Sequence, residues 1–201
     1  MRKGSITVAL ALLIGTATSF HHSSSAAEET DGWLTLVDSS SKGEWSEVGK
    51  ANWELKDGAL TADMLEGKHY AYLVSRNSYN DFQIRAEFWV DSNANTGIFI
   101  RCDQSDKIDS KICYEVNIFD NRPDPSYGTG AIVDVAKVDT MPKAGGKWNI
   151  LEISAKGSHL SVVLNGSRTA DVTDNRHLSG PIALQYGSGV VKFRKVQIKP
   201  L

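Results

Sequence analysis

A strict alternation of apolar and polar residues, repeated in short segments, constrains the fold of this chain more than any other feature. The clearest segment covers residues 82–90, in which Phe82, Ile84, Ala86 and Phe88 alternate with polar or aromatic neighbours. Successive side chains of a β-strand point to opposite faces of a sheet, so a period of two predicts a strand with one buried face. Helical periodicity is nearly absent beyond residue 27. The chain is therefore expected to be all-β.

Turn residues separate these segments at short intervals. Asp57-Gly58 and Asn165-Gly166 each join two alternating segments, and both dipeptides favour the two-residue turn of a β-hairpin because they tolerate a positive φ. Strands at this density, without helices between them, are typical of a sandwich or a barrel. Besides the two hairpins, strands are expected at residues 82–90, 97–101, 114–119, 148–156, 182–185 and 190–198.

The first 27 residues have the layout of a secretory signal peptide. Arg2 and Lys3 precede an apolar run, and a stretch of small residues ends at Ala27. The run is too short to anchor the chain across a bilayer, and a disordered tail is the alternative interpretation. We expect cleavage near Ala27, export to the periplasm or the medium, and a single domain over residues 28–201.

Export bears on the two cysteines, Cys102 and Cys113, which flank an expected loop. An oxidising compartment permits a disulfide between them, and two buried free thiols are the alternative. The compartment favours the disulfide. Two cysteines without a neighbouring histidine make a poor zinc site, so no metal is expected there.

Charge and missing motifs exclude several functions. The chain carries 22 basic and 24 acidic residues, so neither nucleic acid nor an anionic membrane is expected to bind it. The nucleophile elbow of serine hydrolases, the His-Glu-x-x-His zinc motif and a phosphate-binding glycine loop are missing. No cofactor is expected, although acidic loop residues could ligate Ca²⁺ in a spacing that matches no defined calcium loop: Asp103, Asp106, Asp109 and Asp124.

The polar sides of three expected strands mix charged, amide and aromatic groups. They are Gln83, Arg85, Glu87 and Trp89, then Phe99 and Arg101, then Glu115, Asn117 and Phe119. These strands are expected to be neighbours, so that aromatic rings lie beside planar hydrogen-bonding groups, which suits sugar rings with apolar faces and polar edges. Ordinary cross-strand ion pairs, such as Arg101 with Glu115, are an equally good interpretation.

Residues 115–120, Glu-Val-Asn-Ile-Phe-Asp, place two carboxylates and an amide along one segment. The order is similar to the active-site strand of laminarinase-type glycoside hydrolases, in which two carboxylates cleave the glycosidic bond. Glu115 and Asp120 would point to opposite faces of a regular strand, so a bulge would be needed to bring them together. A direct two-carboxylate mechanism is therefore not favoured.

The histidines offer one candidate. His21 and His22 lie in the expected signal peptide, and His159 and His177 are expected at the surface. His69 precedes an expected strand and could reach the rim of a site.

Several motifs, taken in order, resemble one family. They are W-E-L-K-D-G-A-L at 53–60, Y-N-D-F-Q-I-R-A-E-F at 79–88, N-T-G-I-F-I-R at 95–101, Y-E-V-N-I-F-D at 114–120, L-N-G at 164–166, G-P-I-A-L-Q at 180–185 and F-R-K-V at 193–196. Each motif alone is weak, whereas their order and spacing are specific. On these residues the chain resembles the 3-keto-disaccharide hydrolase domain (DUF1080) of exported bacterial proteins, over nearly the whole expected mature chain.

The resemblance implies a concanavalin A-like jelly roll and an action on glycosides oxidised at carbon 3. A ketone at carbon 3 acidifies the hydrogen on carbon 2, so a base can remove it, the aglycone leaves from carbon 1, and water adds back. Glu115 is the expected base or orienting carboxylate, and Arg101 would stabilise developing negative charge. Asp120 or Glu87 would be the second carboxylate. The expected substrate-binding residues are Glu87, Phe99, Asn117, Gln185 and His69.

One position departs from the family pattern. Gln185-Tyr186-Gly187-Ser188 stands where the family has Gln-x-His-Gly. A carbohydrate-binding module without turnover is therefore the alternative to a glycoside-cleaving hydrolase or lyase. A structural or adhesive jelly roll is a third interpretation.

Overall fold

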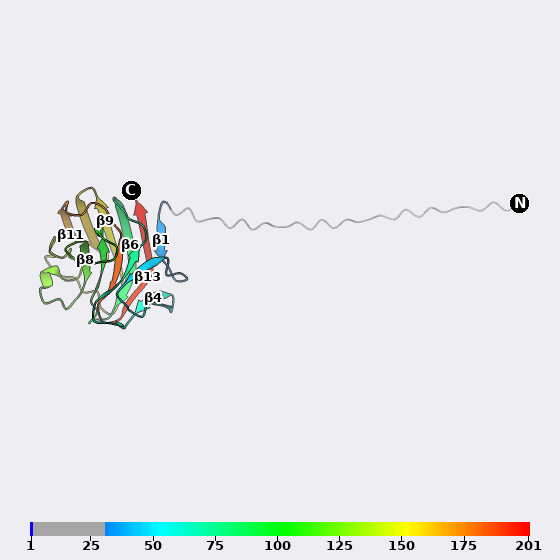
Figure 1. Ribbon diagram of the computed structural model, residues 1–201, viewed down its shortest axis with the longest axis horizontal. Coiled ribbons are helices and arrows are strands. Elements are labelled where there is room, and N and C mark those ends of the chain that lie inside the picture. The colour runs from blue at the N-terminus through cyan, green and yellow to red at the C-terminus, as the bar shows by residue number, and fades with distance from the viewer. Residues whose placement is uncertain (2–30) are drawn as a thin grey trace.

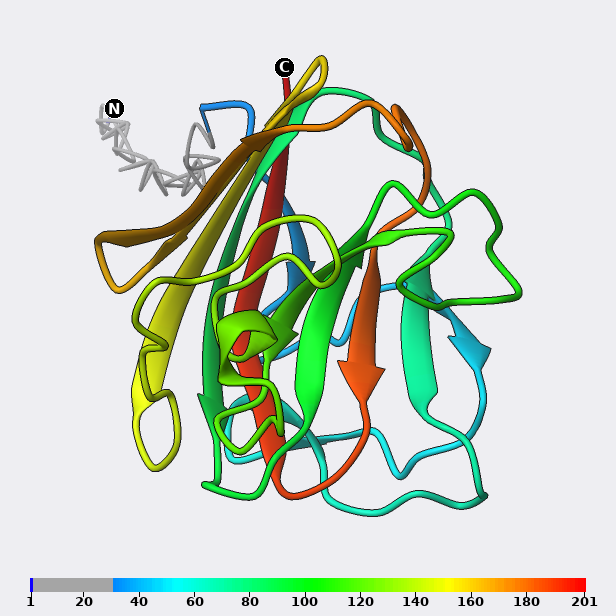
Figure 2. The same cartoon turned by 90° about the vertical axis from the view of Figure 1, so that its left-hand side faces the viewer.

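The computed structural model describes Met1 and residues 31–201. Apart from Met1, the expected signal peptide at residues 1–27 and the expected domain start at residue 28 lie outside the described residues. Residues 31–201 form two antiparallel sheets that pack face to face as a jelly roll (Figures 1 and 2). Within them the helical structure is a single 3₁₀ turn, η1 (Pro125–Tyr127). The predicted all-β fold is confirmed.

The larger sheet has eight strands. Its long central strands are β9 (Trp148–Lys156), β6 (Phe82–Val90) and β13 (Val191–Pro200), with β6 paired to both of the others. Beyond β9 lie β10 (His159–Leu164) and β11 (Ser167–Thr173). Along the other side of β13 lie β4 (Ala59–Ala62), β3 (Glu54–Lys56) and β1 (Leu34–Val37).

The smaller sheet has five strands in the order β2-β5-β12-β7-β8. Their bounds are β2 (Trp45–Val48), β5 (Ala71–Ser75), β12 (Ala183–Tyr186), β7 (Thr96–Ile100) and β8 (Tyr114–Ile118). The order interleaves segments that are far apart in the chain, so this sheet joins residues that no local pattern connects. Figure 2 shows it facing the larger sheet across the core.

One apolar core fills the space between the sheets. Phe88 of β6 and Ile98 of β7 are fully buried members of the same cluster, although they belong to different sheets. Burying one such side chain contributes about 1.5–3 kcal/mol. The predicted alternation is confirmed in β6, where buried residues alternate with exposed or half-buried ones.

The two predicted hairpin turns are confirmed. Asp57 and Gly58 join β3 to β4 with φ of 51° and 72°, and Asn165 and Gly166 join β10 to β11 with φ of 51° and 81°. Both residues of each turn have positive φ, which matches the right-handed twist of the strands. The expected adjacency of residues 82–90 with 97–101 and 114–119 is wrong, because β6 lies in the larger sheet and β7 and β8 in the smaller one.

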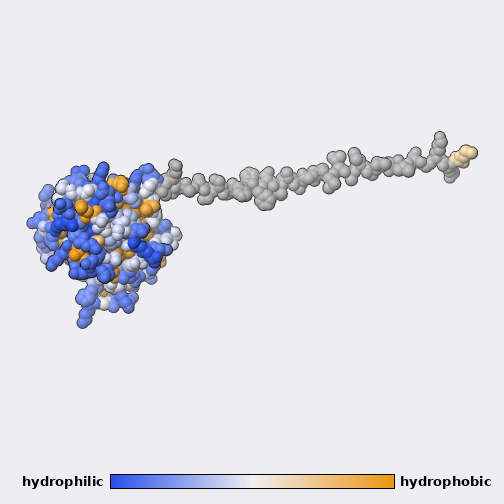
Figure 3. Space-filling model, turned by 45° about the horizontal axis from the view of Figure 1, so that its top comes forward, coloured by the Kyte–Doolittle hydropathy of each residue, from blue (hydrophilic) through white to orange (hydrophobic). Residues whose placement is uncertain are grey.

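The surface in Figure 3 is mainly hydrophilic, with apolar residues scattered over it. Single exposed apolar side chains of this kind are normal for a globular protein. Over the described part of the chain, no helix has the length and apolar character needed to cross a membrane.

Candidate functional site

The outward face of the smaller sheet carries the candidate site. In β8, the core is filled by Tyr114, Val116 and Ile118. The alternation of side chains along a strand therefore turns Glu115 and Asn117 to the other face.

Four neighbouring strands bring chemically different groups to this face. Phe99 on β7 lies directly opposite Glu115 on β8, and Tyr72 on β5 lies directly opposite Gln185 on β12. The rings of Tyr72 and Phe99 meet edge to face, with centroids 5.4 Å apart. Aromatic rings and polar groups thus share one surface, as expected for Phe99 and Glu115, and Gln185 lies on it as well.

Two loops deepen this face into a pocket of about 490 Å³. The loop between β7 and β8 contributes Asp109 and Ser110, and the segment after β8 contributes Arg122 and Asp124. The volume lies in the range of small-molecule sites. The pocket is lined by Tyr70, Tyr72, Asn95, Phe99, Asp109, Ser110, Glu115, Phe119, Arg122, Pro123, Asp124 and Gln185.

Glu115 is the titratable group of this pocket best suited to acid–base chemistry. Burial raises its pKa to about 7, with the Arg122 cation opposing the shift and the Asp134 carboxylate adding to it. A carboxyl group with this pKa is partly ionised at neutral pH and can both accept and return a proton. Glu115 therefore has the electrostatic character of a general base.

Gln185 presents an acceptor that no protein group satisfies. Its side chain is 2% exposed, and its Oε1 has no hydrogen-bond partner among the described residues. Its Nε2 donates to the Tyr72 hydroxyl at 3.4 Å. An unpaired buried acceptor costs free energy, so a ligand hydroxyl that bonds to Oε1 would be favoured.

Gly187 stands where the family pattern has a histidine, and Asn95 lies close to it. A Cβ atom at Gly187 would lie 2.7 Å from the backbone oxygen of Asn95 and 3.2 Å from its side-chain Cγ. The Gly187 N–H donates to the Asn95 carbonyl. Asn95 thus occupies the space that a larger residue at position 187 would need, and Asn95 itself lines the pocket.

The predicted disulfide between Cys102 and Cys113 is present, with Cα atoms 4.2 Å apart. Both cysteines pack with Phe99 and Ile108 in a small apolar cluster on the outward face. The disulfide therefore holds the loop that carries Asp109 and Ser110 against the sheet beside Phe99. It supports the wall of the pocket from outside the lining residues.

Asp120 does not join Glu115. Its carboxylate accepts hydrogen bonds from Thr129 Oγ1 at 2.7 Å and from the backbone N–H groups of Ala144 and Gly145 at 3.0 and 2.9 Å. No bulge turns it toward the pocket, so the two acids point apart as in a regular strand. Asp120 fastens the segment after β8 to the segment before β9.

The expectation that Arg101 shares a face with Glu115 is wrong. β7 ends at Ile100, and Arg101 has a φ of 52°, which breaks the alternation of the strand. Its guanidinium is fully buried and donates to the carbonyls of Asn80 and Gly157 at 2.8 and 2.7 Å. It also pairs with the Asp81 carboxylate at 3.2 Å. Through these contacts Arg101 holds the loop before β6 and the turn after β9 together, away from the pocket.

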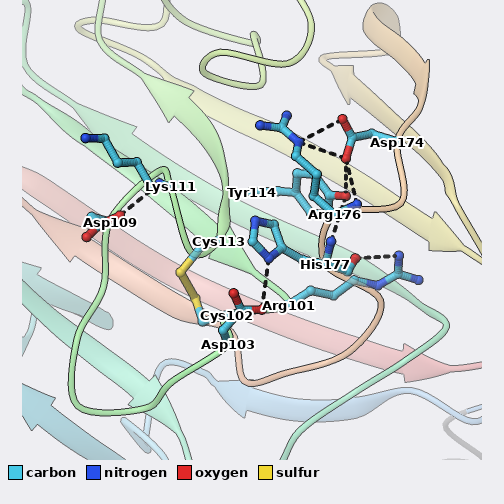
Figure 4. A network of polar contacts seen from close by, with 10 residues as sticks. All are labelled: Arg101, Cys102, Asp103, Asp109, Lys111, Cys113, Tyr114, Asp174, Arg176 and His177. Atoms are coloured by element: carbon cyan, nitrogen blue, oxygen red, sulfur yellow. Dashed lines mark hydrogen bonds and ion pairs between the residues drawn. A yellow bond between two sulfur atoms is a disulfide. The ribbon is translucent and has the colours of Figure 1, made fainter.

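His177 extends this network, although a surface position was expected. The side chain is 6% exposed, and Nδ1 lies 2.9 Å from Asp103 Oδ1. Its backbone N–H donates to the Tyr114 hydroxyl, which donates to Asp174 at 2.6 Å (Figure 4). The network ties the segment after β11 to the base of the disulfide loop.

The other predicted residues also lie away from the pocket. Glu87 is on the outward face of the larger sheet, where it pairs with Arg194, so its proposed place beside Glu115 is wrong. His69 is exposed and is not a lining residue. Asn117 is fully buried and donates to the Tyr127 carbonyl, while its Oδ1 has no partner in the described chain.

Several residues of the pocket were not predicted from the sequence. Tyr70 directly precedes β5, and Tyr72 lies in it, but this short strand is buried throughout and shows no period of two in polarity. Asn95 and Arg122 lie outside regular strands, so strand alternation could not assign them to a face.

Metal-ligating side chains are not grouped in the described residues, where no three His, Cys, Asp or Glu residues come together. The acidic loop residues have other partners. Asp103 bonds to His177, Asp109 accepts from the Lys111 N–H, and Asp124 accepts from Ser126 at the start of η1.

Comparison with known proteins identifies the family. The chain belongs to the 3-keto-alpha-glucoside-1,2-lyase-like domain family, whose model matches residues 30–199. The predicted relation to the 3-keto-disaccharide hydrolase domain is thereby confirmed. No curated protein matches the chain.

Solved structures agree with the jelly-roll fold. A proposed glycosyl hydrolase from Parabacteroides distasonis superposes with a TM-score of 0.72 at 16% identity, over 85% of this chain and 94% of that chain. A second from the same organism gives 0.66 at 21% identity, over 84% and 99% of the chains. The carbohydrate-binding module CBM66 from Bacillus subtilis gives 0.55 at 17% identity, over 84% and 95% of the chains.

Proposed function

We propose that this chain is an exported enzyme that cleaves 3-keto glycosides by elimination followed by hydration, with Glu115 as the base. The observation that carries the proposal is the partly buried carboxyl group of Glu115 in a pocket with aromatic walls, where loss of solvation raises its pKa to about 7. The unpartnered Gln185 Oε1 in the same pocket supports a hydroxyl-bearing ligand. Membership of the family supports the choice of substrate.

The proposed reaction begins at the acidified C–H group. Ionised Glu115 takes the proton from carbon 2 of the 3-keto sugar, and the electron pair of that bond moves into the enolate of the carbon 3 ketone. The enolate then expels the aglycone from carbon 1, which leaves a double bond between carbons 1 and 2. Water adds to carbon 1, and protonated Glu115 returns a proton to carbon 2. General base catalysis of this kind contributes about 10²–10⁴-fold to the rate.

The test is hydrolysis of 4-nitrophenyl 3-keto-glucosides of both anomers by purified chain. Wild type is expected to release nitrophenol and to exchange the hydrogen on carbon 2 for deuterium in D₂O, and Glu115→Gln is expected to lose both activities by about 10²-fold or more. Glu87→Gln is the matched control, because Glu87 lies on the larger sheet, away from the pocket, and pairs there with Arg194. Equal turnover by Glu115→Gln would contradict the role of Glu115.

A carbohydrate-binding module without turnover is the second candidate. It is favoured by Gly187, which stands where the family pattern has a histidine and whose missing side chain would meet Asn95. It predicts that wild type releases no product from either anomer, while the sugar still raises the melting temperature. That result would overturn the enzyme and retain the pocket as a binding site.

A further inference from the structure

The elimination needs a proton donor for the departing oxygen, and the pocket restricts the choice. Arg101, expected to interact with developing charge, lies buried elsewhere. Asp124 has its pKa lowered by hydrogen bonds from Ser126, so it is ionised at neutral pH and has no proton to donate. Glu115 already has the role of the base that takes the proton from carbon 2. The Asp109 carboxylate accepts from the Lys111 N–H and pairs with Lys107, so its oxygens are already used as acceptors. The other acidic O–H groups of the pocket walls are the phenols Tyr70 and Tyr72.

The two phenols differ in their surroundings. Tyr70 is 49% exposed, and its hydroxyl accepts from Asn95 Nδ2 at 3.2 Å. Tyr72 is 7% exposed, is held by its edge-to-face contact with Phe99, and stands on the strand next to Gln185. A buried, fixed donor can be aligned with a leaving oxygen, whereas an exposed one spends its hydrogen bonds on water.

The proton of Tyr72 is available to a ligand, as is that of Tyr70, whose oxygen accepts from Asn95. The oxygen of Tyr72 accepts from Gln185 Nε2, and no described residue accepts its proton. The bond from Gln185 favours the phenolate that would form after proton transfer. Burial, with the charge of Glu115 adding to it, raises the pKa of Tyr72 to about 12, so the group is protonated at neutral pH.

Sheet order places Tyr72 across the pocket from the base, two residues along β5 from the position aligned with Glu115 through Ala183 and Phe99. β5 and β8 are separated by β12 and β7, which puts their backbones about 14 Å apart at the usual strand spacing. Tyr72 and Glu115 both line the single pocket between them. A pyranose ring lying over Phe99 and Gln185 would have one group on each side.

We propose that Tyr72 is the general acid of the elimination, which rests on the function proposed above. As the bond between carbon 1 and the aglycone oxygen breaks, that oxygen takes the phenolic proton and leaves as an alcohol. The Tyr72 phenolate accepts a hydrogen bond from Gln185. In the hydration step, the phenolate takes a proton from water as the water oxygen bonds to carbon 1, which restores the phenol.

The test compares leaving groups that do and do not need an acid. Tyr72→Phe keeps the ring on Phe99 and is assayed with methyl and 4-nitrophenyl 3-keto-glucosides of the anomer that wild type cleaves. We expect a loss of about 10²-fold or more with the methyl glycoside and a loss of a few-fold at most with nitrophenol as leaving group. Hydrogen–deuterium exchange at carbon 2 should persist in Tyr72→Phe and disappear in Glu115→Gln.

Tyr70→Phe is the matched phenol-to-phenyl control, and any loss it causes should be equal for the two substrates. Equal losses with both substrates in Tyr72→Phe, or no loss with either, would overturn the proposal while leaving Glu115 as base. Absence of both exchange and cleavage in wild type would instead overturn the proposed function, and the role of Tyr72 with it. A melting temperature for each variant separates catalytic loss from unfolding.

Discussion

Burial raises the pKa of Glu115 to a value suited to a base, and it also lowers the stability of the folded chain at neutral pH. The pKa of Glu115 in the folded chain is about 7, compared with an ordinary value of 4.5, because the charged form loses solvation in the pocket. The folded state therefore binds more protons than the unfolded state between these values, and stability falls as the pH rises through this window. The burial that raises the pKa of Glu115 therefore also reduces the free energy of unfolding at neutral pH.

Glu115→Gln should remove this cost. We expect the variant to gain stability relative to wild type as the pH rises from 4.5 to about 7, with no further gain above it. The gain should reach about 1–3 kcal/mol. Urea unfolding at several pH values measures it. A variant that is equally stable relative to wild type at pH 4 and pH 8 would contradict a raised pKa at Glu115.

Two neighbours should move the pH profile of the reaction in opposite directions. The Arg122 cation lowers the pKa of Glu115 and the Asp134 carboxylate raises it. Arg122→Met should therefore shift the rise of the rate profile to higher pH, and Asp134→Asn should shift it to lower pH. The measurement is the rate of nitrophenol release against pH. Shifts of the same sign in both variants would be inconsistent with this electrostatic account.

At the scale of elements, Arg101 and the disulfide place loops around the pocket without entering it. Arg101 joins the loop before β6, the turn after β9 and the segment after β11 through its hydrogen bonds. The disulfide holds the loop between β7 and β8. Asp120 anchors the next segment in the same way. The pocket walls are therefore built from fixed loops.

Arg101→Met should destabilise the fold by about 3 kcal/mol or more, since it removes a fully buried guanidinium that bonds to the carbonyls of Asn80 and Gly157 and pairs with Asp81. Arg85→Met is the matched control, because Arg85 is half exposed and pairs with Glu152 on the surface. Its cost should be below about 1 kcal/mol. Thermal unfolding compares the two. Similar costs in both variants would refute the structural role of Arg101.

Replacing Cys102 and Cys113 together by alanine should cost about 3 kcal/mol, because the bridge closes a short loop and limits the unfolded chain. The same change should weaken sugar binding, since Asp109 and Ser110 lose their fixed position in the wall. Chemical unfolding and ligand titration measure the two effects. Unchanged ligand affinity in the folded double variant would show that the disulfide does not shape the pocket.

At the scale of the molecule, the two sheets share one core, but their outward faces differ. The pocket belongs to the smaller sheet, and the outward face of the larger sheet carries exposed ion pairs such as Arg85 with Glu152. The larger sheet supports the pocket from behind, through the residues that its inner face packs against β7 and β8.

Phe88→Ala should therefore affect both sheets at once. Phe88 is fully buried in the shared core, and its loss should cost about 3–5 kcal/mol. Far-UV circular dichroism and tryptophan fluorescence should report a single coincident transition. Leu178→Ala, at a position that is 55% exposed, should change stability little. Separate transitions for the two probes would mean that the sheets unfold independently.

The sequence alone determined the longer strands, the two hairpin turns and part of the candidate site. A period of two in polarity is a local property, so residues 82–90 and 148–156 were predicted with the bounds that the structure has. Asp57-Gly58 and Asn165-Gly166 act locally as well. Glu115, Phe99 and Gln185 could be proposed because each lies on a recognisable strand within a family motif.

The tertiary structure decided which of these residues meet. Sheet membership depends on long-range pairing, and it moved Glu87 to the opposite side of the molecule from Glu115. One residue with positive φ turned Arg101 out of its strand and into a buried network. Tyr72 came to the pocket because β5 pairs with β12, more than a hundred residues later in the chain. Alternation reports the two faces of a strand, but packing determines what each face contacts.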